Sequence, residues 1–84
     1  MVNKIAQEHI ERVYDEAEKD VVTLFGKCAI LACRLKNGFV LVESSACVDP
    51  DNFDINVALN ICEKRIKERL WELEGYLLQN HLSQ

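Results

Sequence analysis

The sequence predicts an α+β fold in which helices cover a two-stranded antiparallel hairpin. Two segments, residues 3–20 and 55–73, repeat apolar side chains at intervals of three and four, which places them on one face of a helix. Between them, Asn37-Gly38 separates two short apolar runs, the strongest local signal of a β-hairpin. The predicted order is an N-terminal helix, a hairpin, a long helix and a short C-terminal helix, in a single domain, residues 1–84.

The first predicted helix, residues 3–20, is amphipathic. Its opposite face is charged and carries opposite charges four residues apart, such as Glu8 and Arg12, so we expect that face to be solvated. Phe25-Gly26 then breaks the helical pattern. The apolar stripe of the helix contains Ala6, Ile10, Val13 and Ala17.

The predicted hairpin has strands at residues 27–36 and 39–43. A two-residue turn requires a positive φ at both turn residues and fixes the register, so that Arg34 would face Leu41. Alternation then gives one apolar face, predicted to pack against the helices: Ala29, Leu31, Cys33, Leu35, Val40 and Val42. The other face mixes cations with apolar side chains. It has several interpretations: a subunit interface, a ligand surface, both of these, or a partly covered surface whose cations extend their charged ends into solvent.

Residues 44–54 connect the hairpin to the long helix and contain the only proline. Asp54 is well placed as the N-cap of a helix that starts at Ile55. Asp49 and Asn52 have two interpretations: they cap backbone groups, or they offer hydrogen bonds to a ligand.

The long helix is predicted over residues 55–73, with Gly75 ending it before a terminal helix at residues 76–82. Four cations lie between positions 64 and 69, and Arg65 and Arg69 share a face. The cluster is either balanced by neighbouring glutamates or holds phosphate, since a guanidinium fork matches phosphate oxygens. The predicted buried stripe contains Ile55, Leu59, Cys62, Ile66, Leu70 and Leu73.

Composition favours self-association and disfavours several functions. Of the 84 residues, 49% are hydrophobic, whereas a domain of this size buries only about 60% of its unfolded surface. We therefore expect a homo-oligomer. The net charge of −4 disfavours DNA binding, which needs a broad basic face. With no glycine-rich phosphate loop and no nucleophile beside a recognisable base, binding is a better hypothesis than catalysis.

The cysteines and the N-terminal segment suggest a reducing compartment. Cys28, Cys33, Cys47 and Cys62 lack the spacing of zinc ligands. The first residues lack the apolar segment of a signal peptide, and no apolar run reaches the roughly 18 residues that span a bilayer. We expect reduced thiols that act as small hydrophobes, no metal, no cofactor and a cytoplasmic location.

Three separated motifs resemble those of a family of small tailed-phage proteins. They are N-G-F at residues 37–39, SACVDPDNFD at residues 45–54 and WELEGYLL at residues 71–78, and they follow one another within about half of the chain. The last motif departs from the family pattern at Glu72, where many relatives have proline. This difference affects the geometry of the helix near the C-terminus and not the proposed ligand contacts. The pattern is also similar to the first Thoeris anti-defence family.

That resemblance implies a function. Members of the Thoeris anti-defence family are sponges that bind cyclic ADP-ribose isomers, and in some cases cyclic oligonucleotides, without cleaving them, and they work as symmetric dimers or hexamers. It implies a phage protein in the cytoplasm of the bacterial host. Asn52 is the residue carried over from the motif, followed by an arginine of the next helix, Arg65 or Arg69.

The side-chain chemistry supplies the other candidates for such a ligand. Phe39 or Phe25 would stack on the base, Arg34 and Lys36 would join the phosphate contacts, and Asp49 would bind hydroxyls or the base edge. The pocket would lie at a subunit boundary.

Two other hypotheses remain. One is a protein-interaction inhibitor of a defence system, such as an anti-CRISPR protein, with an acidic surface formed by Glu8, Glu11, Asp15, Glu16 and Glu18. The other is a structural or regulatory phage protein without a ligand.

Overall fold

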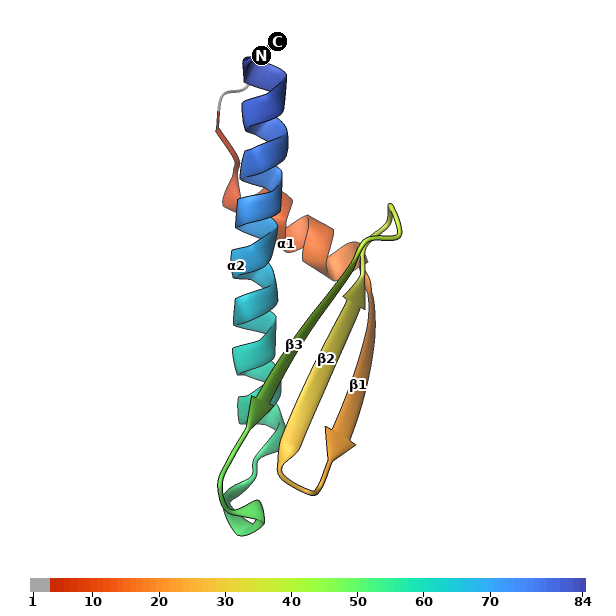
Figure 1. Ribbon diagram of the computed structural model, residues 1–84, viewed down its shortest axis with the longest axis vertical. Helices are drawn as coiled ribbons and strands as arrows, with labels where there is room; N and C mark the ends of the chain where they lie inside the picture. Colours follow the sequence, from red (N-terminus) through yellow and green to blue (C-terminus); the bar gives the residue numbers. More distant parts are fainter. Residues whose placement is uncertain (1–3) are drawn as a thin grey trace.

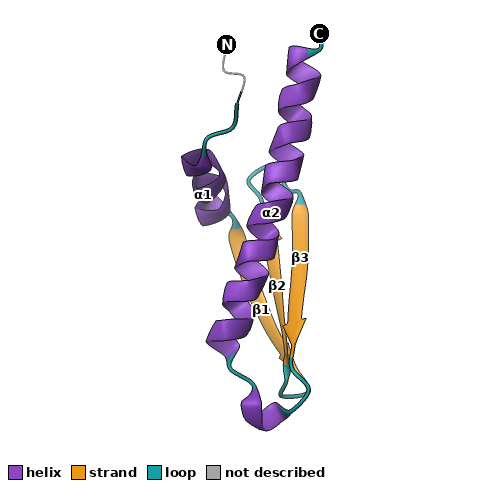
Figure 2. Cartoon of the chain, turned by 90° about the vertical axis from the view of Figure 1, so that its left-hand side faces the viewer, coloured by secondary structure: helices purple, strands orange, loops and turns teal. Residues whose placement is uncertain are grey.

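The computed structural model describes residues 4–84 and has an α+β architecture. Three antiparallel strands form a sheet in the order β1-β2-β3. The long helix α2 lies along one face of β2 and β3, and α1 packs beside α2 (Figures 1 and 2). The elements are α1 (Gln7–Glu16), β1 (Glu18–Leu24), β2 (Cys28–Arg34), β3 (Val40–Ala46), a 3-10 turn (Pro50–Asn52) and α2 (Ile55–Leu82).

The predicted two-stranded hairpin was therefore one strand short. The first helix runs from Gln7 to Glu16 instead of from residue 3 to residue 20, because Ala6 and Ala17 are already extended. Residue 3 itself lies outside the described residues. The segment Glu18–Leu24 forms β1 and pairs with β2, with Val22 opposite Ile30. The β-branched run Val21-Val22-Thr23 favours a strand, and the backbone hydrogen bonds of the sheet outweigh the weak charge pairs that favoured a longer helix.

The β2–β3 hairpin is present, but its predicted register was wrong by one residue. The N–H of Leu35 donates to the carbonyl of Phe39 at 2.8 Å, so the loop has three residues, Lys36 to Gly38. Within this loop only Gly38 has a positive φ, 92°. A three-residue loop with glycine in this conformation is the common alternative to the two-residue turn.

A shift of one residue turns every side chain of β3 to the other face. Arg34 pairs with Val40, and Cys33 pairs with Leu41. Leu41 is consequently buried, whereas Val40 and Val42 are 53% and 49% exposed. The predicted inner face was correct for β2, where Ala29, Leu31 and Cys33 are buried.

Helix α2 is continuous from Ile55 to Leu82, so the separate C-terminal helix was wrong. The Asp54 carboxylate accepts a hydrogen bond from the N–H of Asn56 at 2.9 Å, which confirms the predicted N-cap. Gly75 lies inside the helix, where a glycine costs only about 1 kcal/mol relative to alanine and does not force a break. The predicted stripe is buried at Cys62, Ile66 and Leu70 and is joined by Ala58.

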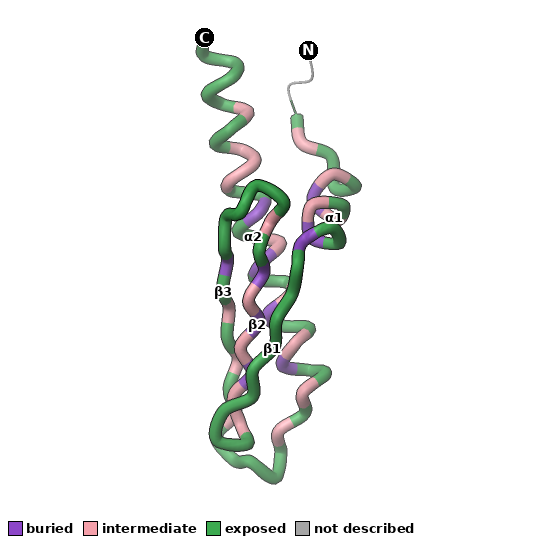
Figure 3. Tube along the Cα trace, turned by 90° about the vertical axis from the view of Figure 1, so that its right-hand side faces the viewer, coloured by how far each residue is buried: buried purple, intermediate pink, exposed green. Residues whose placement is uncertain are grey.

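The core lies where α1, α2 and the inner face of β2 and β3 meet. Outside it, much of the chain is exposed (Figure 3), and many large apolar side chains are among the exposed residues. No residue of β1 is buried, and Tyr76 and Leu77, near the end of α2, are 68% and 61% exposed. The surplus of apolar surface expected from composition is thus present in one chain.

Candidate functional site

The candidate ligand-binding residues lie in three regions, of which the first is formed by two loops at one end of the sheet. Phe25, in the β1–β2 turn, has a φ of 56° and a side chain that is 84% exposed. Asn52 ends the 3-10 turn after β3 and borders a hollow of about 190 Å³. The N–H of Cys47 donates to the carbonyl of Lys27 at 2.9 Å and joins the two loops. Asp49 accepts a hydrogen bond from the N–H of Asp51 at 3.0 Å, so it has the capping role.

The second region is the side of α2 that faces the free edge of β3. Nη1 of Arg65 donates to the carbonyl of Ser44 at 2.8 Å. One turn later, Nη1 of Arg69 lies 3.7 Å from a carboxylate oxygen of Glu43. Within residues 4–84, Arg65 has no carboxylate partner, which distinguishes it from the other three candidate cations.

The third region is at the opposite end of the sheet, around the β2–β3 turn. Nη2 of Arg34 lies 2.8 Å from a carboxylate oxygen of Glu18, and Lys36 pairs with Glu16. Phe39, beside the turn, is 47% exposed. Because strands of seven residues are about 23 Å long, this region and the two loops of the first region lie far apart.

One chain therefore does not bring the eight candidates together. Five hollows lie on the described part of the chain, residues 4–84, among others, and none of these five is lined by candidates from more than one of the three regions. A common pocket for Asn52, Arg65 and Arg34 would need residues from neighbouring copies.

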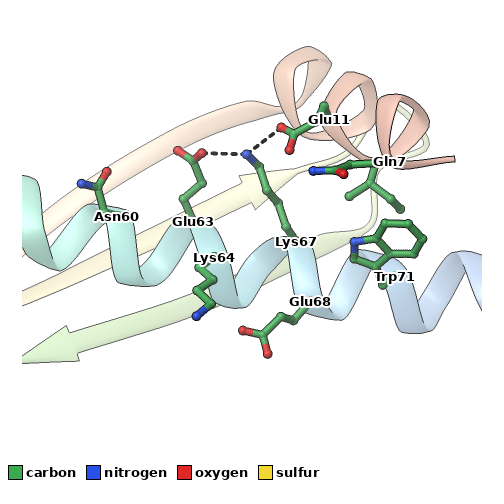
Figure 4. A pocket seen from close by; sticks show the side chains of 9 residues that line it. Gln7, Glu11, Asn60, Glu63, Lys64, Lys67, Glu68 and Trp71 are labelled. Atoms are coloured by element: carbon green, nitrogen blue, oxygen red, sulfur yellow. Dashed lines mark hydrogen bonds and ion pairs between the residues drawn. The ribbon is translucent and has the colours of Figure 1, made fainter.

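A cleft of about 440 Å³ between α1 and α2 was not predicted from the sequence. Figure 4 shows the Lys67 ammonium between the carboxylates of Glu11 and Glu63. Its nitrogen lies 2.7 Å from an oxygen of each carboxylate. The same ammonium lies 4.9 Å from the ring centre of Tyr14. Trp71 borders the cleft and is 40% exposed. The spacing of Glu63 and Lys67 was the only local signal; the contact with Glu11 depends on how the helices pack.

The electrostatics of this cluster follow from its geometry. Burial alone would lower the pKa of Lys67, but its hydrogen bonds to Glu11 and Glu63 raise that pKa well above its ordinary value. The hydrogen bond to Lys67 holds the pKa of Glu63 below its ordinary value of 4.5. Burial, followed by the charge of Glu63, raises the pKa of Tyr14 to about 12.

Replacing Lys67 by methionine should lower the free energy of unfolding by about 1 kcal/mol at neutral pH, because Glu11 and Glu63 lose their shared partner. A carboxylate with a depressed pKa contributes stability above its unfolded pKa and loses it as the pH falls through the folded pKa. The difference from the parent protein should therefore shrink below the ordinary pKa of 4.5.

Urea denaturation at pH 7 and at about pH 3 would measure that difference. Lys64→Met is the matched control, because Lys64 is exposed on the same helix and forms no ion pair within residues 4–84. If Lys67→Met loses the same unfolding free energy at both pH values, the unpaired carboxylates are not the cause of that loss.

The four cysteines differ in burial. All four are free thiols, and Cys33 and Cys62 are buried, where burial raises the pKa of each thiol. Cys28 and Cys47 are partly exposed, so the prediction of buried hydrophobes is confirmed for two of the four. Among residues 4–84, no cluster of three or more His, Cys, Asp or Glu side chains is suited to a metal ion. No helix in the described part of the chain is long and apolar enough to cross a membrane.

Comparison with known proteins gives one family. The model of the family described as "Phage protein (N4 Gp49/phage Sf6 gene 66) family" matches residues 1–82, nearly the whole chain. No curated protein and no solved structure matches significantly.

Proposed function

The chain belongs to the phage protein (N4 Gp49/phage Sf6 gene 66) family, and we propose that it is an anti-defence sponge that binds a cyclic nucleotide immune signal in the host cytoplasm without cleaving it. The ligand class, glycocyclic ADP-ribose isomers or cyclic oligonucleotides, comes from the resemblance of the three motifs to the Thoeris anti-defence family. The binding unit in this proposal is a homo-oligomer, a dimer or a hexamer.

The observation that carries the proposal is the placement of Arg65 and Arg69. They lie one helical turn apart on the side of α2 that faces β3, and both are exposed. Arg65 makes one hydrogen bond, to a backbone carbonyl, and keeps most of its five N–H donors for a ligand. A guanidinium that no carboxylate neutralises is suited to a phosphate oxygen.

A second copy would supply what one chain lacks. The three candidate regions do not meet within a chain, and large apolar side chains are exposed beside two of them: Val40 and Val42 near the β2–β3 turn, and Val57 and Ile61 near Asn52. Burying these side chains between copies would stabilise an assembly. Such an interface can place Asn52 or Phe25 of one copy beside Arg65 of another.

Three of the five carboxylates in the acidic surface of the competing hypothesis form ion pairs. Glu11 pairs with Lys67, Glu16 with Lys36, and Glu18 with Arg34. A mimic of nucleic acid needs unpaired anionic charge in a regular array. The ion pairs therefore favour the sponge over an acidic mimic.

Incubation of the purified protein with cyclic ADP-ribose isomers, cyclic dinucleotides and cyclic trinucleotides tests the proposal. We expect one of these ligands to disappear from the free pool and to return intact after heat denaturation of the protein. Native mass spectrometry of the same samples gives the number of chains and of bound ligands. Recovery of a cleaved product, or no depletion of any of these ligands, would contradict the proposal.

Replacing Arg65 by alanine should weaken binding of that ligand by about tenfold or more, because one charge-assisted contact to phosphate contributes roughly 1.5–3 kcal/mol. Isothermal titration calorimetry measures the affinity, and native mass should stay unchanged. Lys64→Ala is the matched control: it removes the neighbouring cation, which borders the α1–α2 cleft instead of β3. Equal losses in the two variants would indicate a general effect of net charge.

A further inference from the structure

The cleft between α1 and α2 plays no part in the proposed ligand site, and its chemistry is different. Its walls contain one aromatic ring, Trp71, and two side-chain amides, Gln7 and Asn60. A second hollow of about 410 Å³ adjoins it along α1 and shares Gln7 and Glu11 with it. The two hollows therefore lie next to each other, on the surface formed by α1 and the middle of α2.

The charge of this surface is negative. The five carboxylates that border it are Glu8, Glu11, Asp15, Glu63 and Glu68. The three cations that border it are Arg12, Lys64 and Lys67. The Lys67 charge is already shared by Glu11 and Glu63. Glu68, beside Trp71, forms no ion pair within residues 4–84, and neither does Glu8 or Asp15.

Anionic ligands are poorly suited to such a site. A pyrophosphate placed against Trp71 would lie among the carboxylates of Glu11, Glu63 and Glu68, and like charges at that range repel. The cations on this side are Lys64 and Lys67, and Lys67 is already paired with Glu11 and Glu63. The cleft therefore has a negative net charge, whereas the site proposed for the cyclic nucleotide is formed by cations.

We infer that the α1–α2 cleft is a docking site for a basic segment of a partner protein, with an arginine side chain seated on Trp71. A guanidinium stacks on an indole ring and simultaneously donates to a carboxylate and to amide oxygens. Trp71, Glu68 and Gln7 supply these three groups around one hollow. Glu8 and Asp15, farther along α1, would face the next basic residues of the segment. The inference does not depend on the proposed function.

Trp71 is the only tryptophan of the chain, so its fluorescence reports directly on the cleft. The probes are three capped pentapeptides of glycine alternating with arginine, with lysine or with glutamate, and also ADP as an anionic nucleotide. We expect the arginine peptide to change the emission in a saturable, salt-sensitive way. The lysine peptide should bind several-fold more weakly, and the glutamate peptide and ADP should have no effect.

Two variants with the same change of net charge test whether the cleft is the site. Glu68→Gln should weaken binding of the arginine peptide at least threefold, since it removes the carboxylate beside the ring. Glu72→Gln, one turn later and outside both hollows, should leave binding unchanged. Calorimetry of Trp71→Leu should show loss of binding, with circular dichroism confirming that the variant is folded.

Several outcomes would overturn the inference. One is the absence of any emission change with the arginine peptide at millimolar concentration. Another is an equal loss in Glu68→Gln and Glu72→Gln, which would mean attraction to net charge without a site. A response of Trp71 to ADP and not to the peptide would make the cleft an anion site instead. None of these results bears on depletion of cyclic nucleotides, so the two proposals can fail separately.

Discussion

Replacing Leu41 by alanine is expected to lower the free energy of unfolding by about 3 kcal/mol, whereas Val40→Ala should cost less than about 1 kcal/mol. The two residues are neighbours in β3, but Leu41 is completely buried against the core and Val40 is 53% exposed on the outer face. Truncating a buried side chain loses its full transfer free energy and leaves a cavity, whereas truncating a half-exposed one loses only part of that free energy. Urea denaturation followed by circular dichroism measures both values.

The pair of variants also decides between two registers of the hairpin. The two-residue turn predicted from the sequence would place Val40 inside and Leu41 outside, so it requires the opposite order of stabilities. The measurement should be repeated at two protein concentrations, because a subunit contact over the outer face would make the cost of Val40→Ala depend on concentration. A larger loss for Val40→Ala at every concentration would contradict the observed register.

The sequence predicted this hairpin but not its register, for a physical reason. Asn37-Gly38 is compatible both with a two-residue turn and with a three-residue loop that needs a positive φ only at glycine. The following run, Phe39-Val40-Leu41-Val42, is apolar at every position and so does not identify its inner face. The choice is made by packing, because Leu41 fills the space beside Cys33 and α2.

The remaining elements were predictable where a local signal was strong. Asp54 and the regular stripe from Ile55 to Leu73 predicted the start and the buried face of α2 correctly. The end of α1 was missed because charge pairs such as Asp15 and Lys19 are typical of a continuing helix. The competing tendency, the β-branched residues of β1, is expressed only because β2 offers a pairing edge.

The candidate site likewise was predictable in its residue types and not in its geometry. The sequence identified residues of suitable chemistry, but their distances depend on the fold, and one chain separates Asn52 from Arg34 by the length of the sheet. The α1–α2 cleft was missed because the fold brings together residues that no local sequence signal connects. Glu11 and Lys67 are distant in sequence, and the ion pair between them, at 2.7 Å, forms only when the helices pack.

Replacing Ile66 by alanine should lower the free energy of unfolding by about 3 kcal/mol or more. Ile66 is completely buried at the centre of the stripe that α2 directs at the sheet, and it belongs to the cluster that joins α1, α2 and the inner strands. Domains of this size commonly have only about 5–10 kcal/mol of stability. The variant should therefore show a large decrease in the urea midpoint with an unchanged slope.

Ile61→Ala provides the matched control, since it is the same substitution in the same helix at a residue that is 37% exposed. In an isolated chain it should cost about 1 kcal/mol or less. If copies associate through the apolar surface beside Asn52, Ile61→Ala should instead reduce the native mass at low concentration, while Ile66→Ala reduces stability at every concentration. Equal losses of unfolding free energy in the two variants, independent of concentration, would contradict the burial pattern of α2, because residues on different sides of one helix would then contribute equally to the same core. They would also contradict a role of Ile61 in assembly.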